Sequence, residues 1–166
     1  MSILLAFPIL GVLLILQSVV FSRMVLLQGT ADLVLLAVTS WALHKRVSTA
    51  WHWAVIAGLL VGLVTALPPG IALLNYLMAA GIAILLRKRV WQAPVLAMFV
   101  AIFLATIAIQ AVDLLALRLA GSAIPVLQAF NLVTIPSLLL NLLLALPVYA
   151  GVTDLANWLY PEELEV

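Results

Sequence analysis

Long apolar runs fill most of the 166-residue chain, and short polar or basic stretches separate them. A helix that crosses a bilayer needs roughly 20 residues that are mostly apolar. The pattern therefore predicts an all-α integral membrane protein that forms a single domain. Its six transmembrane helices are expected at about residues 3–21, 24–43, 51–67, 71–86, 90–117 and 132–152.

Charged residues, prolines and glycines mark the ends of these runs. The first run lacks a basic leader and a small-residue cleavage pattern, so we expect a retained first helix. The second run is clean from Leu33 to Val38, but it is short or enters the membrane at an angle. The Pro68-Pro69-Gly70 turn ends the third run. The longest loop is expected at Arg118 to Asn131, with room for a short interfacial segment.

The composition excludes several classes of protein. Hydrophobic residues make up 67% of the chain and charged residues 8%, against about 45–50% and about 25% in soluble domains. A soluble globule of this composition could not cover its surface with polar groups. The net charge of +1 gives no electrostatic footprint for nucleic acid. Because there is no cysteine, thiol catalysis and disulfides are excluded.

The basic residues predict the orientation of the chain. Short loops rich in Lys and Arg stay on the cytoplasmic side of a membrane. Five of the seven basic residues lie in the loops after the second and fourth predicted spans: Lys45, Arg46, Arg87, Lys88 and Arg89. The opposite loops hold only Arg23 and Arg118. Tryptophans flank the two basic loops, as in an interfacial belt. We therefore expect both termini in the cytoplasm.

The fifth predicted helix carries a polar stripe in its outer half. Thr106, Gln110 and Asp113 are spaced by four and three residues, which places them on one helix face. Such a stripe would be costly against lipid, so it should face protein or water. It either forms hydrogen bonds between helices or contacts a ligand or partner. Arg118 lies about 140° round the helix from Asp113, so no ion pair between them is expected within a regular helix.

Four further polar residues lie in or beside apolar runs. Asp32 is interpreted as a carboxylate at a helix N-terminus, with Thr30 as the cap; alternatively it faces a polar crevice or a partner. Gln17 and Asn75 lie near outer helix ends, and Asn141 is the deepest amide. For Asn141 an interhelical hydrogen bond is the expected role.

The third predicted helix carries a stripe of small residues. Ala54, Gly58, Gly62 and Ala66 are four residues apart, with a GxxxG at the centre. This spacing lets another helix approach closely. The stripe either packs inside the bundle or docks a single-pass partner helix.

Candidate catalytic and metal-binding groups are few. His44 and His52 flank the first basic loop without a carboxylate or cysteine nearby in sequence. There is no HExxH, no GxSxG and no glycine-rich phosphate loop. We therefore expect no enzymatic activity, no metal and no cofactor.

Four segments resemble the rod shape-determining membrane protein family MreD. Leu16-Gln17-Ser18 resembles the family's LQS element, and Ala31 to Leu36 resembles its PDLLLL segment. Gly58 to Leu63, followed by Pro69-Gly70, resembles its glycine-rich third helix and turn. Leu140 to Pro147 resembles its closing helix with a central Asn. The likeness covers essentially the whole chain, although each motif is short and apolar.

Two positions depart from the family pattern. Ala31 stands where the family often has Pro, and Val64 to Ala66 occupy a stretch where it often has Asp. Any role of that acidic residue therefore does not carry over to this chain.

The resemblance implies a fold similar to the substrate-binding components of energy-coupling vitamin transporters. It implies a non-enzymatic scaffold of the elongation machinery in the bacterial inner membrane, which helps maintain rod shape. The implied partners are the single-pass protein MreC, and beyond it RodA, a transpeptidase and MreB-like filaments. In this reading Asp32, Gln110, Asp113 and Arg118 engage the partner at the outer face, and Gly58 and Gly62 pack against its helix. The alternative is a small-molecule, vitamin-like binding component of a transporter.

Overall fold

The computed structural model describes residues 2–19, 28–68, 70–89, 93–123 and 125–160. This part of the chain is helical and contains no β-strand. The elements are α1 (Ser2–Val19), α2 (Leu33–Leu43), α3 (Ala50–Gly62), α4 (Ile71–Arg89), α5 (Pro94–Leu119), α6 (Val126–Ala129), the π-helix η2 (Phe130–Thr134) and α7 (Ile135–Leu159).

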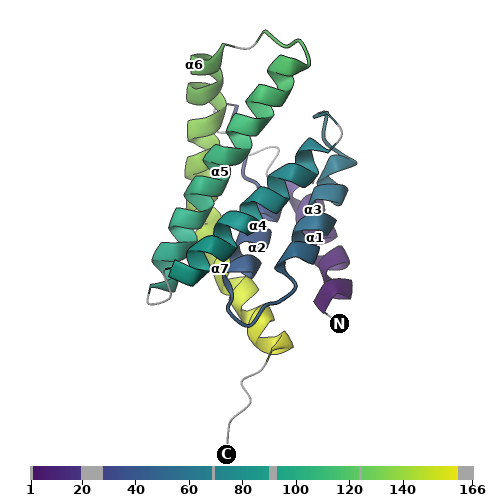
Figure 1. The fold of residues 1–166 in the computed structure, drawn as a ribbon, viewed down its shortest axis with the longest axis vertical. Coiled ribbons are helices and arrows are strands. Elements are labelled where there is room, and N and C mark those ends of the chain that lie inside the picture. The colour runs from purple at the N-terminus through teal and green to yellow at the C-terminus, as the bar shows by residue number, and fades with distance from the viewer. Residues whose placement is uncertain (1, 20–27, 69, 90–92, 124, 161–166) are drawn as a thin grey trace, which may run out of the picture.

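Helix α2 is the core of the bundle. All eleven of its residues are buried, and it contacts α1, α3, α4, α5 and α7. The upper parts of α5 and of the α6–η2–α7 rod rise together above the other helices (Figure 1). Contacts between α5 and η2 are sparse compared with those between α5 and α4. The projecting pair is therefore only loosely closed at its upper end, which we call the α6 end.

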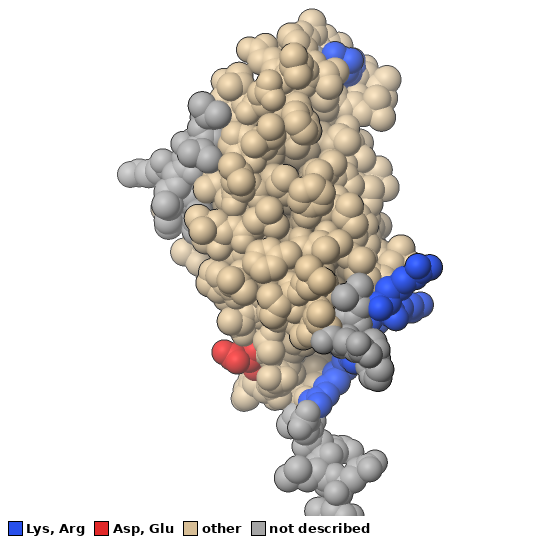
Figure 2. Space-filling view, turned by 90° about the vertical axis from the view of Figure 1, so that its left-hand side faces the viewer, with Lys and Arg blue, Asp and Glu red and all other residues tan. Residues whose placement is uncertain are grey.

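Three helices are long and apolar enough to cross a membrane: Ile71–Arg89, Pro94–Leu119 and the continuous rod Val126–Leu159. Three further apolar helices are shorter, at Ile3–Val19, Leu33–Leu43 and Ala50–Gly62. The visible face is almost entirely uncharged; basic side chains lie near its lower and upper ends, and an acidic one lies near its lower end (Figure 2). On this face the charges thus lie near the two ends, as is expected where a surface meets lipid.

The structure corrects several predicted boundaries. The second span was expected to be helical from residue 24; residues 24–27 lie outside the described part, and 28–32 are not helical. Helix α3 ends at Gly62, five residues before the predicted end. The predicted loop from Arg118 to Asn131 is mostly helix, because α5 runs to Leu119 and α6 begins at Val126.

Helix α2 begins late because residues 28–32 run extended beside the last helical rod. The backbone N–H groups of alternate residues are bonded to that rod: Gln28 N donates to Leu132 O at 3.1 Å, Thr30 N to Ser137 Oγ at 3.1 Å, and Asp32 N to Asn141 Oδ1 at 2.8 Å. Four extended residues span about 13 Å and nine helical residues about 13.5 Å. The two segments therefore keep register over this length.

Pro136 explains why the rod can accept one of these bonds. Proline has no N–H, so it cannot bond the carbonyl four residues earlier, which is that of Leu132. The π-helical turn η2 lies at this point, and π turns are typical where a helix absorbs such a disruption. The Leu132 carbonyl, which Pro136 leaves without its α-helical donor, accepts the N–H of Gln28. A local defect in one helix thus fixes an extended segment from another part of the chain.

The small-residue stripe of α3 packs inside the bundle at Gly58. A Cβ at Gly58 would lie 2.5 Å from Leu73 Cα of α4, whereas one at Gly62 would have Ala72 Cβ at 3.8 Å as its nearest neighbour. Gly58 is buried and Gly62 is exposed. Gly58 therefore makes its close approach to α4. Of the two roles predicted for the stripe, packing inside the bundle is the one that this residue has. Gly58 is not available to a partner helix.

The two glycines provide a matched pair of substitutions. We expect Gly58→Ala to lower the free energy of unfolding by about 1 kcal/mol, because overpacking outweighs the gain in helix propensity. Gly62→Ala should leave stability unchanged or raise it slightly. Unfolding in mixed detergent micelles measures both. Equal effects of the two substitutions would contradict the packing described here.

Candidate functional site

The N-terminus of α2 lies inside the bundle, and side chains of the residue that precedes it and of α1 accept its N–H groups. Asp32 is the N-cap: its Oδ1 accepts from Leu35 N at 2.8 Å. Gln17 of α1 accepts from Val34 N at 3.4 Å. The carboxylate of Asp32 also accepts from the hydroxyl of Tyr76, at 3.1 and 3.0 Å. Asp32 is thus the carboxylate at a helix N-terminus that the sequence predicts, but it caps the helix itself, and Thr30 does not.

Asn141 joins this start of α2 to α5. Its Oδ1 accepts from the backbone N–H of Asp32, and its Nδ2 donates to Thr106 Oγ1 at 3.1 Å. Both Asn141 and Thr106 are buried. The amide is therefore hydrogen-bonded on both sides, and it connects three elements in the middle of the bundle. The interhelical hydrogen bond expected for Asn141 is present.

A second carboxylate lies on the neighbouring helix. Asn75 Nδ2 donates to Asp113 Oδ1 at 2.6 Å, so consecutive residues of α4, Asn75 and Tyr76, hold the two carboxylates Asp113 and Asp32. The other atom of the Asn75 amide, Oδ1, is buried and has no hydrogen-bond partner. Buried polar atoms are nearly always paired in proteins, so an unpaired acceptor calls for an explanation.

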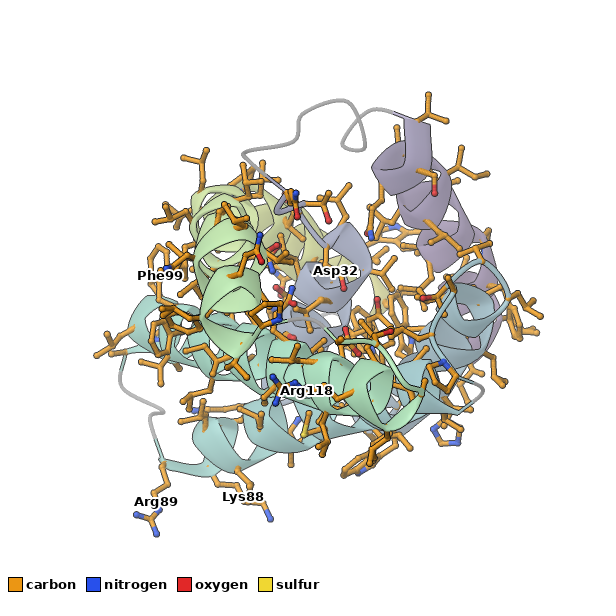
Figure 3. The ribbon with its side chains drawn as sticks, turned by 90° about the horizontal axis from the view of Figure 1, so that it is seen from above. Asp32, Lys88, Arg89, Phe99 and Arg118 are labelled. Carbon is orange, nitrogen blue, oxygen red and sulfur yellow. The ribbon has the colours of Figure 1, made fainter. Side chains whose placement is uncertain are left out.

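These groups surround a cavity of about 250 Å³ in the middle of the bundle. Residues of α1, α3, α4, α5 and α7, of the segment 30–35 and of the turn after α3 line it. Its polar lining residues include Gln17, Asp32, Asn75, Tyr76, Thr106, Gln110, Asp113 and Asn141. Seen from the α6 end, Asp32 lies near the centre of the bundle, while Lys88 and Arg89 lie at its edge (Figure 3). Among the described lining residues there is no lysine, arginine or histidine.

A groove adjoins this cavity between α5 and the α6–η2 segment. It has a volume of about 390 Å³ and shares Gln110 and Asp113 with the cavity. The rest of its lining is mostly apolar, and includes Leu114, Leu117, Ala129 and Val133. The groove lies at the α6 end, where α5 and the α6–η2 segment make few contacts with each other.

The structure brings most of the sequence-predicted polar residues together. Gln17, Asn75, Gln110 and Asp113 line one cavity with Asp32 and Asn141. Arg118 is exposed near the α6 end and does not line it. Sequence reasoning missed Tyr76 and Ser137, which bond the Asp32 carboxylate and the Thr30 N–H. For Tyr76, the only indication in the sequence was a tyrosine next to Asn75 in an otherwise apolar helix.

At the opposite end, Arg87 and His44 join the loop after α2 to its neighbours. Arg87 Nη1 donates to the carbonyls of His44 and Val47, at 2.7 and 3.1 Å. The His44 ring stacks on Tyr149, and its Nε2 lies 3.1 Å from Thr153 Oγ1. Because the Thr153 hydroxyl donates its proton to Tyr149 O, His44 Nε2 must carry the hydrogen in this contact.

This environment predicts a pH dependence of stability. Burial, and then the charge of Arg46, lowers the pKa of His44. The unfolded chain therefore binds a proton more readily than the folded one, so stability is complete above about pH 6.5 and falls as the pH drops below it. We expect a lower melting temperature in detergent at pH 5.5 than at pH 7.5. His44→Gln should reduce that difference, and an unchanged difference would contradict the role of His44.

No protein-family model, curated protein or solved structure gives a match to the chain. The class supported by the structure is thus an all-helical protein with three helices able to cross a membrane.

Proposed function

We propose that the chain is a non-enzymatic scaffold of the bacterial inner membrane, resembling MreD, that binds the single-pass protein MreC at its outer face. The observation that carries the proposal is the groove between α5 and the α6–η2 segment, which is apolar and carries Gln110 and Asp113 at one side. An apolar groove with a few polar groups suits an apolar helix that brings its own polar residue. The resemblance of four sequence segments to MreD supplies the identity of the partner.

The direct test is co-purification with the MreC homologue of the same organism in mild detergent. We expect the two proteins to elute together. Gln128→Trp should fill the groove, since Gln128 is exposed and lines it, and should reduce the amount of MreC retained at least tenfold. Leu85→Trp, at an exposed site on α4, is the control and should retain it. No association of the wild-type chain, or no effect of Gln128→Trp, would contradict the proposal.

The proposal includes six spans with both termini in the cytoplasm, so that the basic end faces inward. The three shorter apolar helices would complete the count, with residues 28–32 acting as the non-helical half of the second span. Irregular backbone at membrane depth is tolerated when protein covers it. The bonds to Leu132, Ser137 and Asn141 provide that cover.

Cysteine labelling tests this orientation, because the chain has no cysteine of its own. Ala123 and Lys88 are exposed at opposite ends. In spheroplasts we expect a membrane-impermeant maleimide to label Ala123→Cys at once, and Lys88→Cys only after permeabilisation. The reverse pattern would show that the chain is inserted the other way round.

A small-molecule binding component of a transporter is the second candidate function, and the polar cavity of about 250 Å³ favours it. Thermal-shift measurements with a panel of water-soluble vitamins distinguish it from the scaffold. Stabilisation by one of them would support this function, and a panel without effect would argue against it.

A further inference from the structure

We infer that the cavity between Asp32, Asn75 and Asp113 is a binding site for an organic cation that carries an ammonium or guanidinium group. The inference does not depend on the proposed scaffold function. It stands on the donor and acceptor inventory of the cavity and on Asn75 Oδ1. Of the three buried side-chain oxygens without a partner in the described residues, the other two being those of Thr39 and Ser40, it is the one on a residue that lines the cavity.

The first step is the charge of the cavity. Two carboxylates, those of Asp32 and Asp113, line it. Among the described residues around it there is no basic side chain. Both carboxylates are half-buried, and removing a carboxylate from water without a cation is costly. Hydrogen bonds from Tyr76, Leu35 and Asn75 offset part of this cost, but none of these donors carries a positive charge.

The second step is the unpaired amide oxygen. Asn75 is only 3% exposed, its Nδ2 is fixed on Asp113, and its Oδ1 has no partner. The orientation of the amide is set by that bond, since a carboxylate can accept only from the nitrogen. The unpaired Oδ1 is therefore a second acceptor, on the same residue that binds Asp113. A carboxylate next to an amide oxygen is an acceptor pair that suits an N–H donor with more than one hydrogen.

The third step is the class of cation. Ammonium and guanidinium groups carry three and five N–H donors and no acceptor. Such a group fits a lining with Asp113, the Asn75 oxygen and Asp32 as acceptors. A cavity of about 250 Å³ leaves room for a short apolar tail.

Binding of butylguanidinium to the purified full chain in detergent tests the inference. Butylurea is the neutral probe, because it has nearly the same shape without the charge. We expect thermal stabilisation and a dissociation constant for butylguanidinium at least tenfold lower than for butylurea. Asp113→Asn should abolish the preference, while Asp154→Asn, which removes an exposed carboxylate at the other end of α7, should retain it. Asn75→Leu should weaken butylguanidinium binding as well.

A free amine and a basic side chain of a bound protein present the same chemistry, and a second measurement separates them. If butylguanidinium stabilises the chain alone, the site accepts a free cation. If it does not, but Asp113→Asn and not Asp154→Asn releases the co-purified partner, the cation is a Lys or Arg of that partner. Equal binding of butylguanidinium and butylurea overturns the inference. So does an Asp113→Asn variant that keeps both the preference for butylguanidinium and the co-purified partner. Failure of co-purification alone would count only against the scaffold.

Discussion

Asn141→Leu is expected to lower the free energy of unfolding by about 3 kcal/mol. The substitution removes the acceptor of the Asp32 N–H and the donor to Thr106. Leaving a buried polar group without its partner costs about 1–3 kcal/mol, and here the loss falls on a backbone N–H at the point where α2 begins. Interhelical hydrogen bonds within membranes are often weaker, at about 0.6 kcal/mol on average. We expect a larger loss of unfolding free energy for Asn141→Leu, because two hydrogen bonds are lost together and both partners are left unpaired.

Equilibrium unfolding in mixed micelles of mild detergent and sodium dodecyl sulfate measures this effect. Asn131→Leu is the matched control, because Asn131 is exposed in η2. It should change the free energy of unfolding by less than about 0.5 kcal/mol, as surface substitutions usually do. Equal stability of the two variants would show that Asn141 does not hold the start of α2.

Gly29→Ala is expected to cost about 3 kcal/mol, at the upper end of the usual range for overpacking. A Cβ at this position would lie 2.5 Å from Ser137 N, 2.6 Å from Pro136 Cβ and 2.9 Å from Pro136 C. Two of these atoms belong to the backbone of the rod, so a side-chain rotation cannot relieve the contact. The extended segment would have to move away from α7 and lengthen its three hydrogen bonds.

Gly11→Ala is the control for this substitution, because a Cβ there would meet no atom within 4 Å apart from those of its own stretch of helix. It should be neutral or stabilising, since alanine is the better helix former by about 1 kcal/mol. Gly29→Ala and Asn141→Leu disturb the same contact, so the double variant should lose less than the sum of the two. Additive losses would indicate that the extended segment and Asn141 are held independently.

The helical class of the fold could be predicted from the sequence, but the start of α2 could not. Met24–Leu27 and Leu33–Leu43 read as one apolar run, because hydropathy does not distinguish helical from extended backbone. The segment is extended because Leu132, Ser137 and Asn141 offer acceptors at matching spacing. That match depends on which helices are neighbours, and a single sequence does not contain this information.

The sequence indicates which polar residues form the candidate site, but not which of them are hydrogen-bonded to one another. The 106–110–113 stripe was expected to face protein or water, and it does. The pairing of Asp113 with Asn75, and of Asp32 with Tyr76, depends on α4 packing beside both α2 and α5. The stripe on α3 was ambiguous for the same reason, and the contact of Gly58 with Leu73 decides it for that residue.

Site-specific photocrosslinking in the membrane tests the proposed scaffold most directly. A photoreactive phenylalanine analogue at Leu117 would lie in the groove, and one at Leu85 would lie on the exposed face of α4. We expect a crosslink to the MreC homologue from position 117 and none from position 85. Crosslinking from position 85 alone, or from neither position, would contradict a partner seated between α5 and the α6–η2 segment.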